Sequence, residues 1–124
     1  MSASEFSLPA SLYRPLQFCV GAYGLFIVWA SLRPAGTGGA IPHMDKVLHF
    51  GVYAILAFSV ALAWPRLPKL RVFWVCALFG ALLEVAQGTF TAGRMASGWD
   101  AMANSLGAGL GVLALILMTR ISSR

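Results

Sequence analysis

Four long apolar runs, joined by short polar linkers, limit what this chain can fold into. They cover residues 16–32, 47–64, 72–90 and 101–119. Crossing the hydrocarbon core of a bilayer takes about 20 mostly apolar residues, with about 17–25 observed. Only 10% of the 124 residues are charged, against about 25% in an average soluble domain. We therefore exclude soluble and disordered classes and predict an all-α integral membrane bundle of four transmembrane helices.

The segments outside the apolar runs define the boundaries of one membrane domain. Residues 1–15 mix apolar side chains with serines and two prolines, which indicates an interfacial segment. Residues 16–120 form the predicted four-helix domain, and residues 121–124 form a short tail. The first run is longer than the apolar part of a signal peptide, which has about 7–15 residues, and no A-x-A cleavage site follows it. We therefore expect it to be a retained anchor.

Basic residues in the short linkers predict the orientation in the membrane. An even number of spans places both termini on one side. That side carries six bases, which are Arg14, Arg66, Lys69, Arg71, Arg120 and Arg124. The other side carries three, which are Arg33, Lys46 and Arg94. Because Lys and Arg are enriched on the cytoplasmic side, both termini are predicted to be cytoplasmic. The orientation in the membrane accounts for the excess of basic over acidic residues, so no nucleic-acid partner is expected.

Nine polar residues in or next to the second, third and fourth apolar runs lie at the predicted outward end of the bundle. They are Asp45, Lys46, His49, Tyr53, Glu84, Gln87, Arg94, Asp100 and Asn104. At 3.6 residues per turn, the members from each run share one face of their helix. Small residues continue two of these faces, which indicates that the polar faces point into the bundle. We predict that these nine residues line an outward-facing polar pocket.

Glu84 is the most informative member of this set. It lies six residues before the end of its run, which is about 9 Å deep at 1.5 Å per residue. A charged acid at the centre of a membrane helix costs about 2.5–3.5 kcal/mol on insertion scales. Such a residue is a functional candidate, and His49, Tyr53 and Arg94 are within reach as partners. The alternative is a buried acid that only ties helices together.

Several other members also have purely structural interpretations. Asp45 and Asp100 lie in first helical turns, where an acid suits the helix dipole. The Ser97-x-x-Asp100 pattern resembles a capping box. Lys46 can extend its amine to the interface, and Asn104 can form a hydrogen bond between helices. These interpretations stay open, although all of them would have to coincide at one depth.

Acid–base and metal chemistry are both compatible with the set. His49, Glu84 and Asp100 are the catalytic candidates, because a His and carboxylates can transfer protons. No serine or cysteine is well placed as a nucleophile. Together with Asp45, the same residues have the ligand types of a metal site. The pattern is not one that we know as a metal signature, so we predict no metal. Nothing in the sequence identifies a cofactor.

Binding is the third chemistry that the set allows. Lys46 and Arg94 would suit a phosphate or a carboxylate, with helix N-termini assisting. Membrane lipids are therefore the expected partners. The Gly107-x-x-x-Gly111 stripe is a surface that lets another helix come close. It is also a candidate face for a homo-oligomer.

The combined motifs resemble the VanZ-like family of bacterial membrane proteins. They read Asp45-Lys46-x-x-His49, Glu84-x-x-Gln87, Arg94 and Asp100-x-x-x-Asn104-x-x-Gly107. Their order and spacing agree with the family over about residues 45–115, while residues 1–40 agree only as a generic preceding span. The stretch between Arg94 and Asp100 is more apolar than the usual family form.

The resemblance implies a multi-pass protein of the bacterial cytoplasmic membrane. The name-giving member is associated with resistance to the glycopeptide teicoplanin, through reduced binding of the drug at the cell surface. The resemblance therefore implies an envelope protein that binds or modifies an envelope lipid or a lipid-linked headgroup. It also adds a lipid-linked envelope precursor or a glycopeptide to the expected partners. The alternatives are a headgroup hydrolase or transferase that uses His49, Glu84 and Asp100, and a non-catalytic structural or interaction protein.

Overall fold

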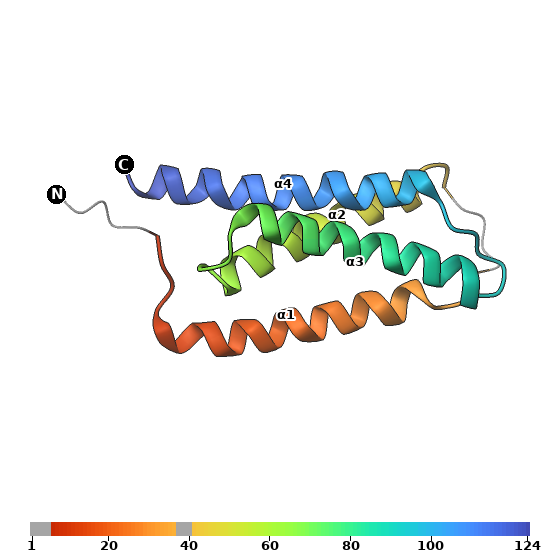
Figure 1. The fold of residues 1–124 in the computed structure, drawn as a ribbon, viewed down its shortest axis with the longest axis horizontal. Helices are drawn as coiled ribbons and strands as arrows, with labels where there is room; N and C mark the ends of the chain where they lie inside the picture. The colour runs from red at the N-terminus through yellow and green to blue at the C-terminus, as the bar shows by residue number, and fades with distance from the viewer. Residues whose placement is uncertain (1–5, 37–40) are drawn as a thin grey trace.

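The described part of the chain is an up-and-down bundle of four helices. The computed structural model describes residues 6–36 and 41–124. Within them the helices are α1 (Ala10–Ser31), α2 (Met44–Ala63), α3 (Lys69–Phe90) and α4 (Gly98–Ser122). The start of α1 and the end of α4 lie at one end of the bundle, and the end of α1, the start of α2 and the α3–α4 linker lie at the other (Figure 1). The prediction of an all-α, four-helix chain is confirmed.

The helices extend beyond the apolar runs at their starts. α2, α3 and α4 each begin about one turn before the corresponding apolar run. The first turn of each helix is polar, so it was not counted in the apolar run. α1 begins at Ala10 and contains Pro15, so part of the predicted interfacial segment is helical. Pro15 lies near the start of α1, where it removes a single intrahelical hydrogen bond. Residues 1–5 of that segment lie outside the described residues.

Three of the helices have the length and composition of a membrane span, namely α2, α3 and α4. α1 is as long as α3, but Arg14 and Gln17 make its first turns more polar. The outer surface of the bundle is apolar. On α3, for example, Val75, Leu78 and Leu82 are each more than half exposed. An exposed apolar stripe on the outer surface of the bundle is typical of a helix that faces lipid.

The closest packing is between α2 and α4. A Cβ atom added at Gly107 would clash with the backbone of Phe50, and one added at Gly111 would clash with the backbone of Ala54. The prediction of a close helix contact along this stripe was correct, but the neighbour is α2 of the same chain. The stripe is therefore occupied, and an association of two copies has to use another surface.

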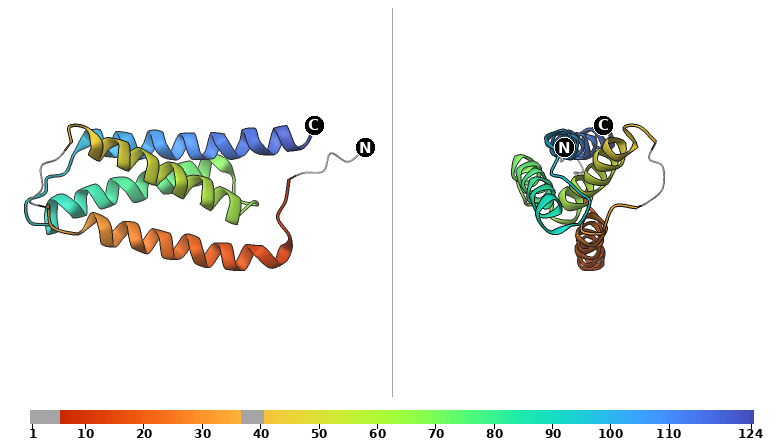
Figure 2. Two further views of the ribbon diagram at one scale, coloured as in Figure 1. Left: turned by 180° about the vertical axis from the view of Figure 1, so that it is seen from behind. Right: turned by 90° about the vertical axis from the view of Figure 1, so that its right-hand side faces the viewer.

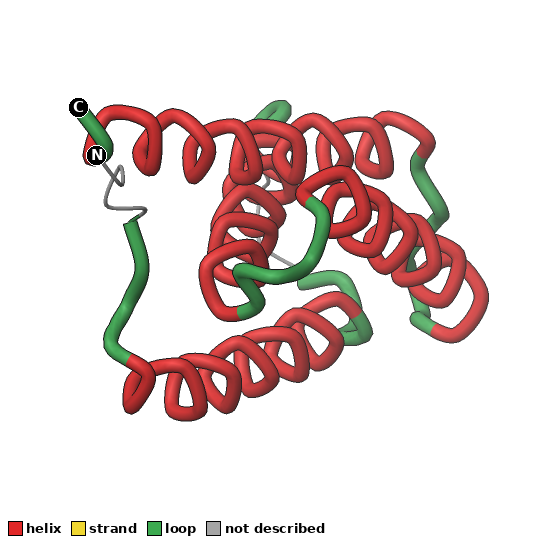
Figure 3. The backbone as a smooth tube through the Cα atoms, turned by 60° about the vertical axis from the view of Figure 1, so that its left-hand side comes forward, coloured by secondary structure: helices red, strands yellow, loops and turns green. Residues whose placement is uncertain are grey.

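α1 lies against α2 and α3, on the side of the bundle away from α4 (Figure 2). The hydroxyl of Tyr23 donates a hydrogen bond to the Val52 carbonyl at 3.0 Å. Near the other end of α1, Nε2 of Gln17 donates to the Ala63 carbonyl at 3.0 Å. The tube view shows α1 as the most separate of the four helices at the end with the termini (Figure 3). Polar contacts therefore attach a helix that buries few of its own residues.

Candidate functional site

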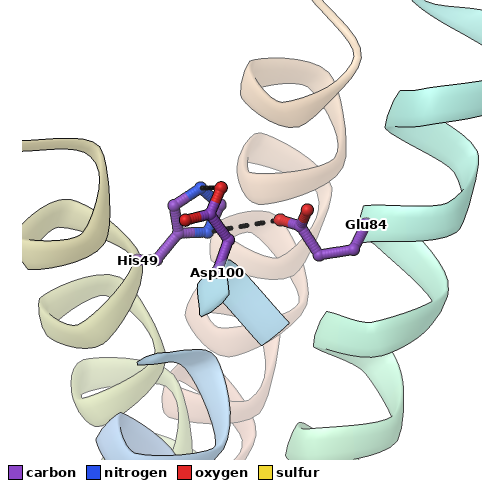
Figure 4. A group of neighbouring side chains, drawn as sticks. All are labelled: His49, Glu84 and Asp100. Carbon is purple, nitrogen blue, oxygen red and sulfur yellow. Dashed lines mark ion pairs between the residues drawn. The ribbon is translucent and has the colours of Figure 1, made fainter. Parts of the chain in front are cut away.

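Three helices bring His49, Glu84 and Asp100 together at the end opposite the termini. His49 comes from the second turn of α2, Glu84 from the last two turns of α3, and Asp100 from the first turn of α4. Figure 4 shows the two carboxylates directed towards the imidazole ring. One ligand atom from each residue lies within 4.8 Å of the other two. The structure therefore gathers at one point the three residues that the sequence analysis named as catalytic candidates.

The imidazole of His49 has a polar neighbour at each nitrogen. Its Nδ1 lies 3.0 Å from Oδ1 of Asn104 and 3.6 Å from Oε1 of Glu84. Its Nε2 lies 3.8 Å from Oδ2 of Asp100. Because an amide oxygen only accepts hydrogen bonds, the contact with Asn104 places a proton on Nδ1. In the neutral ring, Nε2 then carries the free lone pair.

Glu84 is the most deeply buried acid of the described residues, with 4% of its surface exposed. Its Oε2 accepts a hydrogen bond from the backbone N–H of Ser97 at 3.2 Å. Its Oε1 faces His49 at a distance beyond hydrogen-bonding range. The sequence analysis placed this carboxylate inside the bundle with His49 as a partner, and the structure agrees.

The start of α4 explains why the carboxylate of Asp100 is available. Ser97 is the N-cap of α4, and its hydroxyl accepts a hydrogen bond from the backbone N–H of Asp100 at 3.2 Å. A complete capping box would direct the acid back to the N–H of the cap residue. That N–H is bonded to Glu84 instead. The Asp100 carboxylate therefore turns towards Lys46 and His49.

Lys46 and Asp45 lie at the rim of this cluster. Nζ of Lys46 is 3.0 Å from Oδ2 of Asp45 and 3.4 Å from Oδ1 of Asp100. The side chain of Asp45 is 53% exposed, against 13% for Asp100. Helical spacing placed Asp45 on the face of His49, but the first turn of α2 protrudes at the end of the bundle. Asp45 is therefore paired with Lys46 and lies outside the central group.

A cavity of about 330 Å³ adjoins the cluster between α1, α2 and α3. Its polar lining comes from His49, Tyr53, Gln87 and Arg94, together with Ser31 of α1. Its apolar lining includes Phe26, Ile27, Leu48 and Val52. The cavity therefore has an apolar wall along two helices and a polar wall next to the carboxylates.

Arg94 lines this cavity and carries a buried donor. Within the described residues, its Nε is buried and has no hydrogen-bond partner. Gln87 has a structural task in addition, because its Nε2 donates to the Ser31 carbonyl of α1 at 2.9 Å. Tyr53 is 2% exposed and packs against Phe79, with ring centroids 6.2 Å apart. Of these three residues, only Arg94 presents an unpartnered charged group.

Sequence reasoning missed two contributors to this end of the bundle. The first is the wall from α1, where Phe26 and Ile27 are apolar residues in an apolar run and carry no signal. The second is the backbone N–H of Ser97, because a backbone donor has no sequence signature. The proximity of Glu84 to a helix start was the one indirect clue, since such starts present free N–H groups.

Comparison with known proteins agrees with these motifs. The sequence matches the VanZ/LLP1 family over residues 5–119. The chain belongs to the VanZ/LLP1 family. The match includes all four helices apart from the last residues of α4, so it extends well beyond the 45–115 region that carried the resemblance. No match was found among curated proteins or among solved structures. With its apolar helices, this VanZ/LLP1 protein is a multi-pass membrane protein.

Proposed function

We propose that this VanZ/LLP1 protein binds the phosphate-bearing headgroup of an envelope lipid or lipid-linked precursor. One observation carries the proposal: the cavity combines an apolar wall with Arg94, whose buried Nε has no hydrogen-bond partner among the described residues. A buried donor without a partner costs about 1–3 kcal/mol, and more when it is charged. A ligand oxygen in the cavity, with a small rotation of the Arg94 side chain, would remove that penalty.

The chemistry of the cavity favours a phosphate on an apolar chain. The planar guanidinium of Arg94 matches phosphate oxygens in a paired geometry. Lys46 lies outside the cavity lining and is paired with Asp45 and Asp100, so Arg94 is the one cation among the described residues that line the cavity. The wall formed by Ile27, Leu48 and Val52 suits an acyl or isoprenyl chain. A soluble phosphate compound would leave this wall unused.

The proposed orientation places this end at the outer face of the bacterial cytoplasmic membrane. In that arrangement all four helices cross the bilayer, and both termini are cytoplasmic. The six-to-three distribution of Lys and Arg supports it, as does the common end of the two termini (Figure 1). α1 would cross beside α2, to which Gln17 and Tyr23 attach it. The pocket would then face the outer leaflet, where lipid-linked envelope precursors are exposed.

A role in glycopeptide susceptibility follows from this proposal as its physiological consequence. A protein that holds the headgroup of a lipid-linked precursor lowers the amount of precursor that is free to bind a glycopeptide such as teicoplanin. In this account the glycopeptide itself does not enter the cavity, because about 330 Å³ is small even for a drug-sized ligand, for which pockets are about 300–1,000 Å³.

Chemical modification of the headgroup is the second candidate function. It is favoured by His49 lying between the carboxylates of Glu84 and Asp100, since a His held by a carboxylate can act as a general base. No nucleophilic side chain of the described residues lines the cavity close to His49 except the hydroxyls of Ser31 and Tyr53. A reaction at this site would therefore use His49 to activate water.

Lipid binding by the full-length chain tests the proposal. The purified protein would be titrated with polyprenyl phosphate, phosphatidylglycerol, diacylglycerol and inorganic phosphate, with bound ligand counted by native mass spectrometry. We expect the two phospholipid-type anions to bind, and diacylglycerol and inorganic phosphate to bind far more weakly. Loss of a charge-assisted hydrogen bond of about 1.5–3 kcal/mol predicts that Arg94→Ala weakens binding about 10–100-fold.

Arg33→Ala is the matched control, because Arg33 lies on the same predicted side and contacts Trp29 instead, with Cζ 4.7 Å from the ring centroid. Its affinity is expected to equal that of the wild type. Equal affinities of Arg94→Ala and wild type would contradict the proposal. Release of a dephosphorylated or transferred product during the same titration would favour the second candidate function.

A further inference from the structure

We propose that His49, Glu84 and Asp100 form a binding site for one divalent metal ion of the Zn²⁺ or Mn²⁺ class. The sequence contains the ligand types of such a site but no metal signature that we know, so the sequence analysis predicted no metal. The structure brings a His nitrogen and two carboxylate oxygens from three helices within 4.8 Å of one another. An imidazole with carboxylates is a ligand set that suits these borderline ions.

The separations within the group favour an ion over direct hydrogen bonds. Nδ1 of His49 lies 3.6 Å from Glu84 Oε1, and Nε2 lies 3.8 Å from Asp100 Oδ2. Both distances are too long for hydrogen bonds. Two ligands that each lie about 2.0–2.2 Å from a tetrahedral ion are about 3.4 Å apart. The separation of Nε2 from Asp100 Oδ2 is therefore close to that of two ligands of one ion, whereas Glu84 Oε1, which faces Nδ1, would have to turn towards Nε2.

Asp100 supplies a second indication of a ligand. Among the described residues, its Oδ1 is buried and has no hydrogen-bond partner, although Nζ of Lys46 lies 3.4 Å away. A buried carboxylate oxygen without a donor is unfavourable. Coordination of this carboxylate to a cation would reduce that cost.

Neighbouring groups orient each of the three ligands. The Nδ1–Asn104 contact at 3.0 Å leaves Nε2 of His49 free to coordinate. The N–H of Ser97 holds Oε2 of Glu84, which leaves Oε1 free. Lys46 lies beside Oδ1 of Asp100, which leaves Oδ2 free. Metal-binding His and carboxylate side chains are characteristically held in this way by outer neighbours.

The charge balance of the group also favours a cation. The carboxylates of Glu84 and Asp100 are both largely buried, and a neutral His49 adds no positive charge. Lys46 cannot neutralise both acids, because it also pairs with Asp45 at 3.0 Å. The charge of Arg94 also acts on Glu84, but within the described residues Arg94 forms no ion pair with either carboxylate. The competing arrangement is a protonated His49 between two carboxylates with no ion. The two arrangements differ in whether the protein binds a metal, so the experiment below separates them.

The ion would have a role in the proposed lipid binding. Three protein ligands leave a coordination position open, as in zinc sites that bind substrate. His49 lines both the ligand group and the cavity, so this position would open towards the headgroup. One phosphate oxygen could then bind the ion while Arg94 binds a second oxygen of the same phosphate. This last step rests on the proposed function, whereas the metal site itself does not.

Cobalt titration of the full-length protein tests the site. The protein would be purified in detergent, treated with EDTA and titrated with Co²⁺, and bound cobalt followed by its visible absorption and by elemental analysis. We expect one ion per chain, displaced by one equivalent of Zn²⁺. His49→Ala, Glu84→Gln and Asp100→Asn are each expected to abolish the absorption bands. Asn104→Ala is expected to weaken binding about 10–100-fold, because it orients His49.

His43→Ala is the matched control for this titration, because it removes the exposed His next to α2. It is expected to bind Co²⁺ like the wild type. Absence of stoichiometric binding by the wild type overturns the inference. So does binding that His43→Ala abolishes and His49→Ala does not. Folding of each variant would be checked by helical circular dichroism and gel filtration.

Lipid titrations in EDTA distinguish this inference from the proposed function. Lipid that binds in an Arg94-dependent way to a protein without metal affinity would overturn the metal site alone. Stoichiometric Co²⁺ binding without any lipid binding would overturn the proposed function alone.

Discussion

The backbone N–H of Ser97 donates a hydrogen bond to Oε2 of Glu84, 3.2 Å away. This contact connects the inner part of α3 to the start of α4. It satisfies one of the free N–H groups of the α4 N-terminus and one oxygen of a buried acid at the same time. It also leaves the Asp100 side chain, which a capping box would have used, free to face His49.

The first prediction concerns the hydrogen bond that the Glu84 side chain accepts from the N–H of Ser97. Glu84→Gln keeps a carbonyl oxygen that can accept from Ser97, whereas Glu84→Ala leaves that N–H unsatisfied and creates a void. We expect Glu84→Ala to be less stable than Glu84→Gln by about 1–3 kcal/mol, measured by unfolding in mixed detergent. Equal stabilities of the two variants would show that the contact with Ser97 contributes nothing.

The second prediction concerns the N-cap of α4. Ser97→Ala removes the hydroxyl that accepts from Asp100, and loss of such a cap costs about 1 kcal/mol. Ser105→Ala is the matched control, because Ser105 bonds only to the Ala101 carbonyl of its own helix. We expect the control to stay within about 0.5 kcal/mol of the wild type. A larger loss for Ser105→Ala than for Ser97→Ala would contradict this role of the cap.

The third prediction concerns the glycine stripe between α2 and α4. Gly107→Ala and Gly111→Ala place a methyl group against the backbone of the facing helix, which cannot move aside as a side chain can. We expect either change to prevent close packing and to reduce the yield of folded protein sharply. Gly109→Ala is the control, because its Cβ would lie 3.6 Å from the ring of Phe73, an ordinary contact. Gel filtration in detergent measures the outcome, and wild-type behaviour of Gly107→Ala would refute the packing.

The fourth prediction concerns orientation. In a chain whose native Cys19 and Cys76 are replaced by alanine, single cysteines would be introduced by Met95→Cys and Ser123→Cys. Met95 is 87% exposed in the α3–α4 linker, and Ser123 lies just beyond α4. A membrane-impermeant thiol reagent applied to intact spheroplasts is expected to label the first variant only. The reverse labelling pattern would place the polar end in the cytoplasm and remove the outer-leaflet part of the proposal.

The sequence predicted the fold well because apolar length and helical periodicity act locally. It also placed His49, Glu84 and Asp100 at one end, since three helices expose their polar turns at the same depth. It could not separate Asp45 from Asp100, because both occupy a first turn and only the neighbouring helices decide which one is covered. The sequence also could not predict which helix packs against the Gly107 stripe. Small residues indicate that some helix packs closely, but they do not identify that helix.

The apolar wall of the cavity shows the same limit. Ile27 of α1 and Val52 of α2 are both apolar residues in apolar runs, and no pattern marks them as facing a void. Their position depends on how α1 attaches, which is set by bonds such as that from Gln87 to the carbonyl of Ser31. A pairing of a side chain with a backbone carbonyl 56 residues away has no sequence signature.

Photo-crosslinking with a polyprenyl phosphate that carries a diazirine in its chain tests the central claim most directly. The account predicts that crosslinks map to the cavity beside His49, at Ile27, Leu48 and Val52, and that Arg94→Ala strongly reduces them at a lipid concentration near the wild-type Kd. The end with the termini offers a built-in comparison, since a cavity of about 410 Å³ there is lined by Lys69 and Arg120. Crosslinks confined to that second cavity, or unchanged by Arg94→Ala, would contradict the account.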